Sequence, residues 1–256
     1  ESTAIFMPFT SQELIQKGGM YYGLNAVSKR LIVLKRINLK NANGFILGTP
    51  GSGKSFAAKR EMVNVLLSTL DDVIIIDPER EYTPLAENFG GEIIHVSTSS
   101  KNHINPMDIN TNYSDKDEPT KLKSEFILSL CECIIGGSSG LSAKERTIID
   151  RCVDKTYTKF MQNLDDEKMP TLLDFQNMLE AQPEEEARSI ALELELYTRG
   201  SLSAFAKKTN INMNKRLVVF DIKDLGKQLK TMGMLIVLDA VWNRITQNRI
   251  IGKTTW

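Results

Sequence analysis

The sequence of 256 residues predicts an α/β fold with a mainly parallel β-sheet. Two apolar runs, Val73–Asp77 and Leu217–Asp221, each end in an acid and have the pattern of strands buried on both faces of such a sheet. Ile93–Val96 is a third run of this kind. Between Ile93–Val96 and Leu217–Asp221 lies a long stretch with helical spacing. Strands that alternate with helices are typical of the α/β class.

The overall composition is that of an ordinary folded domain. Apolar residues make up 41% of the chain and charged residues 25%, far from the values of disordered or collagen-like chains. Basic and acidic residues both number 32, so the formal net charge of zero gives no overall electrostatic footprint for nucleic acid. Three cysteines are a sparse and odd set, which favours a reducing compartment over a disulfide-bonded secreted protein.

Neither a membrane span nor a signal peptide is predicted. The most apolar stretch, Met232–Trp242, carries Asp239 and is much shorter than the roughly 20 apolar residues that a span needs. The N-terminus shows no basic segment followed by an apolar one, so we expect no secretory signal. Because Glu1 rather than methionine comes first, we expect a fragment of a longer protein.

The first part of the core, residues 1–114, is expected to begin with a β-hairpin. Residues 20–36 contain two β-type runs around Asn25–Lys29. Phe45–Leu47 is predicted to be a short buried strand, and the apolar spacing of Phe56–Leu70 predicts a helix.

A helical subdomain, residues 115–208, is expected to interrupt the core, which then continues through residues 209–256. Its helix signals are capping boxes at Ser142–Glu145 and Thr171–Asp174 and an acidic first turn at Glu184–Glu186. After this insertion, Lys227–Gln247 is predicted to form a long amphipathic helix, and Thr254 to enter one more strand.

The run Gly48–Ser55 matches the phosphate-binding pattern G-x-x-x-x-G-K-[ST], with a predicted strand before it and a helix after it. Glycines let backbone N–H groups turn toward phosphates, and the helix N-terminus adds the positive end of its dipole. Lys54 is expected to reach the β- and γ-phosphates and Ser55 to bind Mg²⁺. The expected nucleotide contacts are Gly48, Thr49, Pro50, Gly51, Ser52, Gly53, Lys54, Ser55 and Phe56.

Nucleotide hydrolysis also needs a carboxylate near the magnesium ion and one that orients the attacking water. Asp77 and Glu79 follow a predicted strand, and ligands of open α/β sheets bind at the carboxyl ends of strands. We therefore expect Asp77 to contact Mg²⁺, directly or through water, and Glu79 to orient water. With Lys54 they form the expected catalytic set. The alternative is that both acids cap a helix begun by Pro78.

Asp221 is another candidate for the acid that accompanies the magnesium ion, because it too ends a predicted strand. Ile222 follows it at the position where many ATPases have a glutamate, which argues against this role. A GTPase is disfavoured because the guanine-reading motif Asn-Lys-x-Asp is missing and Asn214–Leu217 departs from it.

Several longer motifs resemble the conjugative type IV secretion ATPases of the FtsK/HerA-like P-loop superfamily, especially versions from Gram-positive mobile elements. The resemblance covers nearly the whole chain, and several motifs are more specific than the phosphate loop alone. The motifs are Phe6–Ser11, Gly19–Gly23, Asn43–Ser55, Asp77–Tyr82, Ile104–Asp108 and Asp221–Gly226. The resemblance implies a RecA-like P-loop NTPase core with a mainly parallel sheet, an N-terminal β-hairpin and a helical insertion subdomain.

This resemblance implies an ATPase that uses ATP and Mg²⁺ to drive pilus assembly and the export of DNA or protein. The implied partners are other subunits of the same ATPase in a hexameric ring, secretion channel and coupling proteins, and DNA. The implied location is cytoplasmic, peripheral to the inner face of the bacterial cell membrane through partners. In this family Asp77–Glu81 is implied to line the nucleotide pocket.

The family's Walker B pair, Asp-Glu, follows the strand expected to begin near Thr254, and an arginine supplied between subunits comes later still. The chain is therefore expected to bind nucleotide with weak or no turnover, with Asp221 as the alternative Walker B residue. Two other functions stay open: a translocase of double-stranded DNA, and an interaction platform that binds ATP without hydrolysing it.

Some residues that can mark functional sites favour structural roles here. Cys131 and Cys133 lie in an apolar helical stretch without a second pair at zinc spacing, so core packing is expected. His95 and His103 flank a polar loop and are expected to serve the strand and the turn.

For two further segments, a structural and a functional interpretation both stay open. Tyr21 and Tyr22 are expected to pack in the hairpin, with stacking on adenine as the alternative. For Ile104–Asp108, a turn with a helix cap and a functional loop are equally open.

Overall fold

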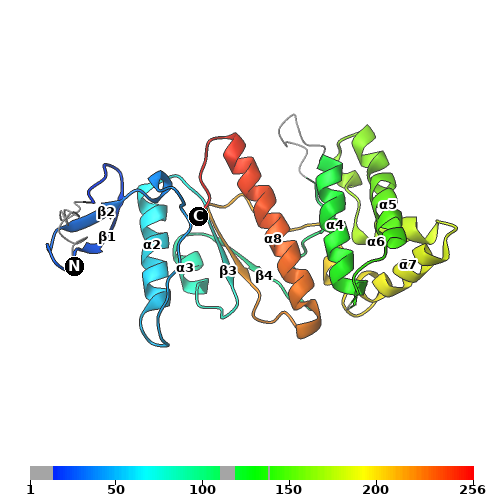
Figure 1. The fold of residues 1–256 in the computed structure, drawn as a ribbon, viewed down its shortest axis with the longest axis horizontal. Coiled ribbons are helices and arrows are strands. Elements are labelled where there is room, and N and C mark those ends of the chain that lie inside the picture. Colours follow the sequence, from blue (N-terminus) through cyan, green and yellow to red (C-terminus); the bar gives the residue numbers. More distant parts are fainter. Residues whose placement is uncertain (1–13, 110–118, 138) are drawn as a thin grey trace, which may run out of the picture. The chain divides into compact units, whose positions relative to one another are not determined.

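The computed structural model describes residues 14–109, 119–137 and 139–256, and the chain divides into two compact units, residues 1–70 and 71–256. The first unit contains a hairpin and the helix after the phosphate loop, and the second contains a parallel sheet and the remaining helices (Figure 1). The motif Phe6–Ser11 and the predicted boundary at residues 114 and 115 lie outside the described residues. The predicted division at 114 and 208 stays a prediction.

The first unit opens with the expected antiparallel hairpin. β1 (Met20–Leu24) pairs with β2 (Leu31–Leu34), and a short 3₁₀ helix, η1 (Arg36–Asn38), follows. In the connecting turn, the side-chain oxygen of Asn25 accepts hydrogen bonds from the backbone N–H groups of Val27 and Ser28, each at 2.9 Å. An asparagine whose side chain accepts hydrogen bonds from the backbone of the turn favours this local conformation, which explains why the hairpin could be predicted.

The hairpin packs on α2 (Lys54–Ser68) through its two tyrosines. The Tyr22 hydroxyl donates to Glu61 at 2.8 Å, and burial together with Glu61 raises the pKa of Tyr22 to about 12. The guanidinium of Arg60 lies over the Tyr21 ring, 5.1 Å from its centroid, and donates to the Tyr21 carbonyl. Both tyrosines therefore contact α2, which supports the expected packing role, and stacking on adenine stays an untested alternative.

The predicted strand at Phe45–Leu47 is wrong. This segment has no strand structure, and its three side chains are 91%, 44% and 87% exposed. A strand needs a neighbour that supplies N–H and C=O partners, and the described strands of this unit, β1 and β2, pair with each other. An apolar run alone does not provide such a partner.

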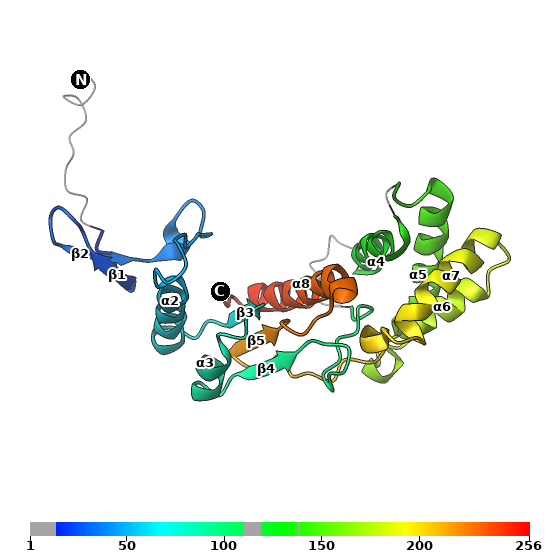
Figure 2. The same ribbon diagram turned by 90° about the horizontal axis from the view of Figure 1, so that it is seen from below.

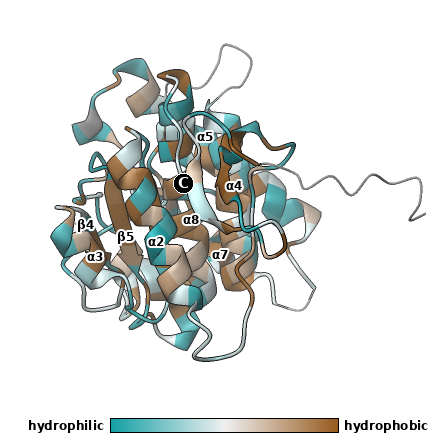
Figure 3. Cartoon of the chain, turned by 90° about the vertical axis from the view of Figure 1, so that its left-hand side faces the viewer, coloured by the Kyte–Doolittle hydropathy of each residue, from teal (hydrophilic) through white to brown (hydrophobic). Residues whose placement is uncertain are grey.

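The second unit is built on a parallel sheet of three strands in the order β3 (Val73–Asp77), β5 (Leu217–Asp221), β4 (Glu92–His95). The register aligns Asp77 with Asp221 and His95 with Asp221. All five residues of the central strand β5 are buried, and most of the strand is brown in Figure 3. These strands confirm the predicted α/β class and place three polar side chains level at the carboxyl edge.

The C-terminal residues form a parallel bridge beside the start of β3, at the place where the sequence predicted the entry to one more strand. The backbone N–H of Asp72 donates to Thr254 at 3.0 Å, and that of Ile74 donates to Trp256 at 2.9 Å. The buried Asp72 carboxylate accepts from Arg244 and Asn248, each at 2.7 Å, and pairs with Lys253 at 2.5 Å. Burial opposes the charge of Asp72, but these partners hold its pKa below the usual value.

Helices α3 (Thr83–Asn88) and α8 (Lys227–Ile250) pack near the sheet (Figure 2). The second is three residues longer than predicted. Its buried apolar side chains join those of β5 in the core, and they are Leu229, Met232, Ile236 and Val237.

In the described part of the chain between β4 and β5, four α-helices follow one another, as expected for an insertion. They are α4 (Pro119–Ile135), α5 (Ala143–Gln162), α6 (Leu172–Glu180) and α7 (Glu185–Thr198), with short 3₁₀ helices η2 (Asp166–Lys168) and η3 (Ser203–Phe205). Both predicted capping boxes are present, at Ser142 and at Thr171, and α7 has the predicted acidic first turn.

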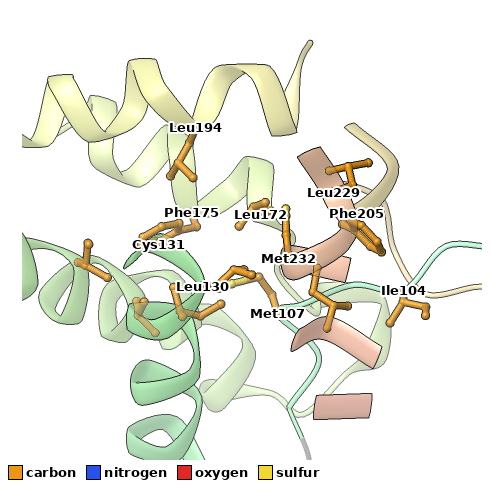
Figure 4. Close-up of a cluster of buried hydrophobic side chains, with 14 of the residues drawn as sticks. Ile104, Met107, Leu130, Cys131, Leu172, Phe175, Leu194, Phe205, Leu229 and Met232 are labelled. Atoms are coloured by element: carbon orange, nitrogen blue, oxygen red, sulfur yellow. The ribbon is translucent and has the colours of Figure 1, made fainter. Parts of the chain in front are cut away.

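The inserted helices share one hydrophobic core with the sheet. In Figure 4, Cys131 of α4 and Phe175 of α6 belong to the same cluster as Met107 and Met232. Burial raises the pKa of the Cys131 thiol to about 12, so it acts as a packing residue. Within the described residues, no group of three or more His, Cys, Asp or Glu side chains is arranged to hold a metal ion.

The segment Ile104–Asp108 forms a turn held by Asn105. The Asn105 amide donates to Asp108 and to the carbonyl of Pro170, each at 2.8 Å, and accepts from Met107 N–H at 3.1 Å. With its polar groups used internally, Asn105 supports the structural interpretation of this motif.

A buried ion pair connects this turn with α4 and α8. The Lys123 ammonium, only 4% exposed, contacts Asp239 at 2.7 Å and donates to the carbonyl of Pro106 at 3.1 Å. Burial lowers the pKa of Lys123 and raises that of Asp239, and each charge partly offsets this effect on the other.

Replacing Lys123 by alanine should lower the free energy of unfolding by about 3–5 kcal/mol, because it leaves the Asp239 charge buried without its partner. The double replacement Lys123→Met with Asp239→Leu should cost much less, since it removes both charges and keeps similar volume. Urea unfolding of the three proteins measures this difference. An equal loss in the single and double variants would contradict the assignment.

Candidate nucleotide-binding site

The phosphate loop has a local backbone geometry that depends on its glycines. Gly51 and Gly53 have φ angles of 78° and 86°, in the left-handed region that favours glycine. A Cβ atom on Gly48 would lie 2.3 Å from the Ser52 hydroxyl oxygen, so no larger residue fits there without a shift. The glycines of the motif thus allow the chain to curl from Gly48 into α2.

Lys54 folds back across this loop. Its ammonium donates to the carbonyl of Thr49 at 2.9 Å, and the Ser52 N–H donates to the same carbonyl at 3.2 Å. A phosphate oxygen is a stronger acceptor than this carbonyl because the hydrogen bond becomes charge-assisted. The lysine therefore lies where it can exchange one acceptor for the other.

The N-terminus of α2 is open to an anion. Gly53 caps it without any side-chain hydrogen bond, and its first turn contains no acidic residue. Unpaired N–H groups and the positive dipole end together favour a bound phosphate. Ser55, half-buried in this first turn, carries the hydroxyl that suits Mg²⁺, and Phe56 beside it is 75% exposed. These residues fit a nucleotide phosphate with its metal ion.

Asp77, at the carboxyl end of β3, is 1% exposed and organises the segment that follows it. Its two carboxylate oxygens accept from the backbone N–H groups of Glu79 at 3.1 Å and of Tyr82 at 2.8 Å. The alternative of a helix begun by Pro78 is wrong, because α3 begins at Thr83. A proline fits many turns, and here Asp77 satisfies the N–H groups of a loop.

Glu79 and Arg80 differ in where they lie within this segment. Glu79 is exposed, whereas the guanidinium of Arg80 pairs with both Asp221 and Asp224. Arg80 has a φ of 60°, an uncommon conformation for a residue with a long side chain.

Asp221 is committed to partners on both of its oxygens. One accepts from Arg80 and contacts the ring nitrogen Nδ1 of His95 at 2.8 Å, and the other accepts from Lys223 N–H at 3.1 Å. Burial opposes the charge of this carboxylate, of which 1% is exposed, but Arg80 and the other donors hold its pKa below the usual value. A metal ion would have to displace these donors.

Residues 29–254 match the model of the TraG P-loop domain. The chain belongs to the TraG P-loop domain family. The match takes in most of the chain, including the phosphate loop and both acid-ended strands, and it confirms the predicted resemblance to conjugative type IV secretion ATPases.

Solved structures confirm the fold of this TraG P-loop domain. The structure of VirB4 of Thermoanaerobacter pseudethanolicus matches with a TM-score of 0.78 at 23% identity. The match covers 93% of this chain but 66% of the VirB4 chain, so the chain spans just under two thirds of that relative. No curated protein matches the sequence.

The expected site residues of the TraG P-loop domain fall in both units. Gly48–Phe56 belongs to the first unit, and Asp77 and Glu79 belong to the second. Their assignment to nucleotide and metal binding stays a prediction. The sequence analysis did not predict that Arg80 and His95 are the partners of Asp221. In the sequence Arg80 stands near Asp77 and is 141 residues from Asp221, so its position did not specify which acid it pairs with.

Replacing Asp221 by asparagine should lower the free energy of unfolding by about 1–3 kcal/mol at neutral pH, since it removes charged hydrogen bonds. Because the folded pKa is depressed, the wild-type advantage is present above the unfolded pKa near 4 and is lost as pH falls through the folded pKa. Urea unfolding at a series of pH values measures this loss. With exposed Asp154→Asn as the control, a difference that is independent of pH would contradict the assignment.

Proposed function

We propose that this chain is the ATP-binding motor domain of a conjugative type IV secretion ATPase, which powers the export of DNA or protein and pilus assembly. The observation that carries the proposal is the phosphate loop itself: a curled glycine backbone, Lys54 and an uncapped helix N-terminus. Membership of the TraG P-loop domain family favours a role in secretion over other nucleotide-dependent functions.

In this proposal, ATP enters with Mg²⁺ and its phosphates are bound by the first turn of α2. The N–H groups of Gly51–Ser55 surround the phosphates, and Lys54 leaves the Thr49 carbonyl to bind the β- and γ-phosphate oxygens. The Ser55 hydroxyl would hold the magnesium ion, which would neutralise charge on the phosphates during hydrolysis. Phe56 and the remaining loop residues, Thr49, Pro50 and Ser52, complete the contacts.

We assign different roles to the three acids at the carboxyl edge of the sheet. Glu79 is exposed and orients the attacking water. Asp77 uses both oxygens to hold its own loop, so its influence on magnesium is through water. Asp221 serves Arg80 and His95, which argues against a direct role as the Walker B acid.

The working form that we propose is a hexamer of the full ATPase, in which neighbouring subunits complete each nucleotide site. By itself this chain is expected to bind ATP with little turnover, because in the proposed hexamer each nucleotide site is complete only with groups from a neighbouring subunit. Secretion channel and coupling proteins, and DNA, are the proposed partners at the cytoplasmic face of the cell membrane. None of the helices in the described ranges is long and apolar enough to cross a membrane.

Calorimetric titration with ATP and Mg²⁺ tests the assignment. The Lys54→Ala variant should bind about tenfold to a hundredfold more weakly than wild type, because a charge-assisted hydrogen bond contributes about 1.5–3 kcal/mol. Ser55→Ala should lose most of the gain in affinity that Mg²⁺ gives. Lys40→Ala, an exposed lysine of the same unit, is the control and should bind like wild type. Equal affinities in wild type and Lys54→Ala would contradict the proposed site.

A further inference from the structure

The segment Asp77–Tyr82 is joined to the end of β5 by backbone contacts. The N–H of Ile222 donates to the Asp77 carbonyl at 3.1 Å, and the Lys223 ammonium donates to the Glu79 carbonyl at 3.4 Å. Both contacts come from the motif Asp221–Gly226, to which the proposed function gives no role in nucleotide binding. The two motifs therefore form one structural unit at the carboxyl edge of the sheet.

Arg80 adds the strongest link between these motifs. Its guanidinium pairs with Asp221, of which 1% is exposed, and with Asp224, of which 61% is exposed. A planar guanidinium can bond two carboxylates in fixed directions, which a lysine ammonium does not do. The link thus fixes the orientation of Arg80 as well as its position.

The backbone at Arg80 supports this interpretation. A left-handed φ of 60° is unfavourable for arginine and persists where the surroundings determine it. The residue before it, Glu79, has its carbonyl held by Lys223 and its N–H held by Asp77, while its side chain is exposed. The two hydrogen bonds that hold the Glu79 backbone therefore come from the two motifs that Arg80 links, Asp77–Tyr82 and Asp221–Gly226.

We propose that Arg80 is a positioning residue, which ties the Asp77–Tyr82 segment to Asp221 and Asp224 and so holds Glu79 in the direction that water activation requires. This inference rests on the proposed function, because it assumes that Glu79 orients water. It also explains what the motif Asp221–Gly226 does, since the two acids of that motif anchor Arg80. In an alternative role, Arg80 would leave the acids and bind a nucleotide phosphate directly.

The test measures ATP hydrolysis and ATP affinity in the full-length protein that contains this chain, for wild type, four single variants and one double variant. Arg80→Ala removes the link, and Arg80→Gly removes it while also relieving the left-handed backbone. Asp224→Asn removes only the exposed anchor, so its folding is the least at risk. Glu79→Gln removes the carboxylate that the link is proposed to position.

Arg80→Ala and Arg80→Gly should each lower kcat about a hundredfold with KM and ATP affinity near the wild-type values, because small misplacements of a catalytic group have effects of this size. Asp224→Asn should lower kcat by a smaller factor. Combining Arg80→Ala with Glu79→Gln should cost no more than Glu79→Gln alone, since both changes remove the same function. Amide exchange at Glu79 and Tyr82 should be faster in Arg80→Ala.

Matched controls are Arg188→Ala in α7 and Glu87→Gln in α3, both exposed, which should keep the wild-type kcat. A wild-type kcat in Arg80→Gly, or losses from Arg80→Ala and Glu79→Gln that multiply in the double variant, would overturn the positioning role. A loss of ATP affinity in folded Arg80→Ala would favour the direct phosphate contact instead. No turnover in wild type, or unchanged turnover in Glu79→Gln, would overturn the role of Glu79 and this inference with it. If Glu79→Gln lowers kcat but Arg80→Ala does not, only the positioning role is overturned and the proposed function stands.

Discussion

A buried negative charge at the end of the central strand determines how the carboxyl edge of the sheet is arranged. Asp221 ends β5, and only 1% of its side chain is exposed. Such a carboxylate is stable only with donors around it. Arg80 and His95 come from segments on either side of β5, so satisfying this one charge joins the ends of all three parallel strands. Glu79, the neighbour of Arg80 in the sequence, is exposed beside this group of contacts.

The phosphate loop has a different physical origin, because its geometry is local. Left-handed glycines, a lysine that reaches back over the loop and an open helix N-terminus all arise within Gly48–Phe56. Such a loop needs no distant partner to present N–H groups to an anion. In the proposed function, binding of the phosphates and orientation of the water are therefore assigned to segments that satisfy separate structural constraints.

Local constraints are also the ones that could be predicted well from the sequence. The capping boxes at Ser142 and Thr171, the turn around Asn25 and the phosphate loop depend on residues a few positions apart, and the structure contains all four. The buried strands Val73–Asp77 and Leu217–Asp221 were predicted from their continuous apolar pattern, which reports burial on both faces.

Interactions between residues far apart in the sequence were not predicted. Arg80 and Asp221 are 141 residues apart, and nothing in either motif specifies that the two strands are neighbours in register. The strand predicted at Phe45–Leu47 was wrong for a related reason, since a strand depends on a partner as well as on its own residues.

Binding of the ATP phosphates and Mg²⁺ by Gly48–Phe56 is the interaction on which the proposed function depends. Amide hydrogen exchange, followed residue by residue with and without ATP and Mg²⁺, tests it directly because it reports on the N–H groups that are proposed to bind. Bound ATP should slow exchange most strongly at Gly51–Phe56. Slower exchange elsewhere in the chain, with this segment unchanged at saturating ATP, would contradict the assignment.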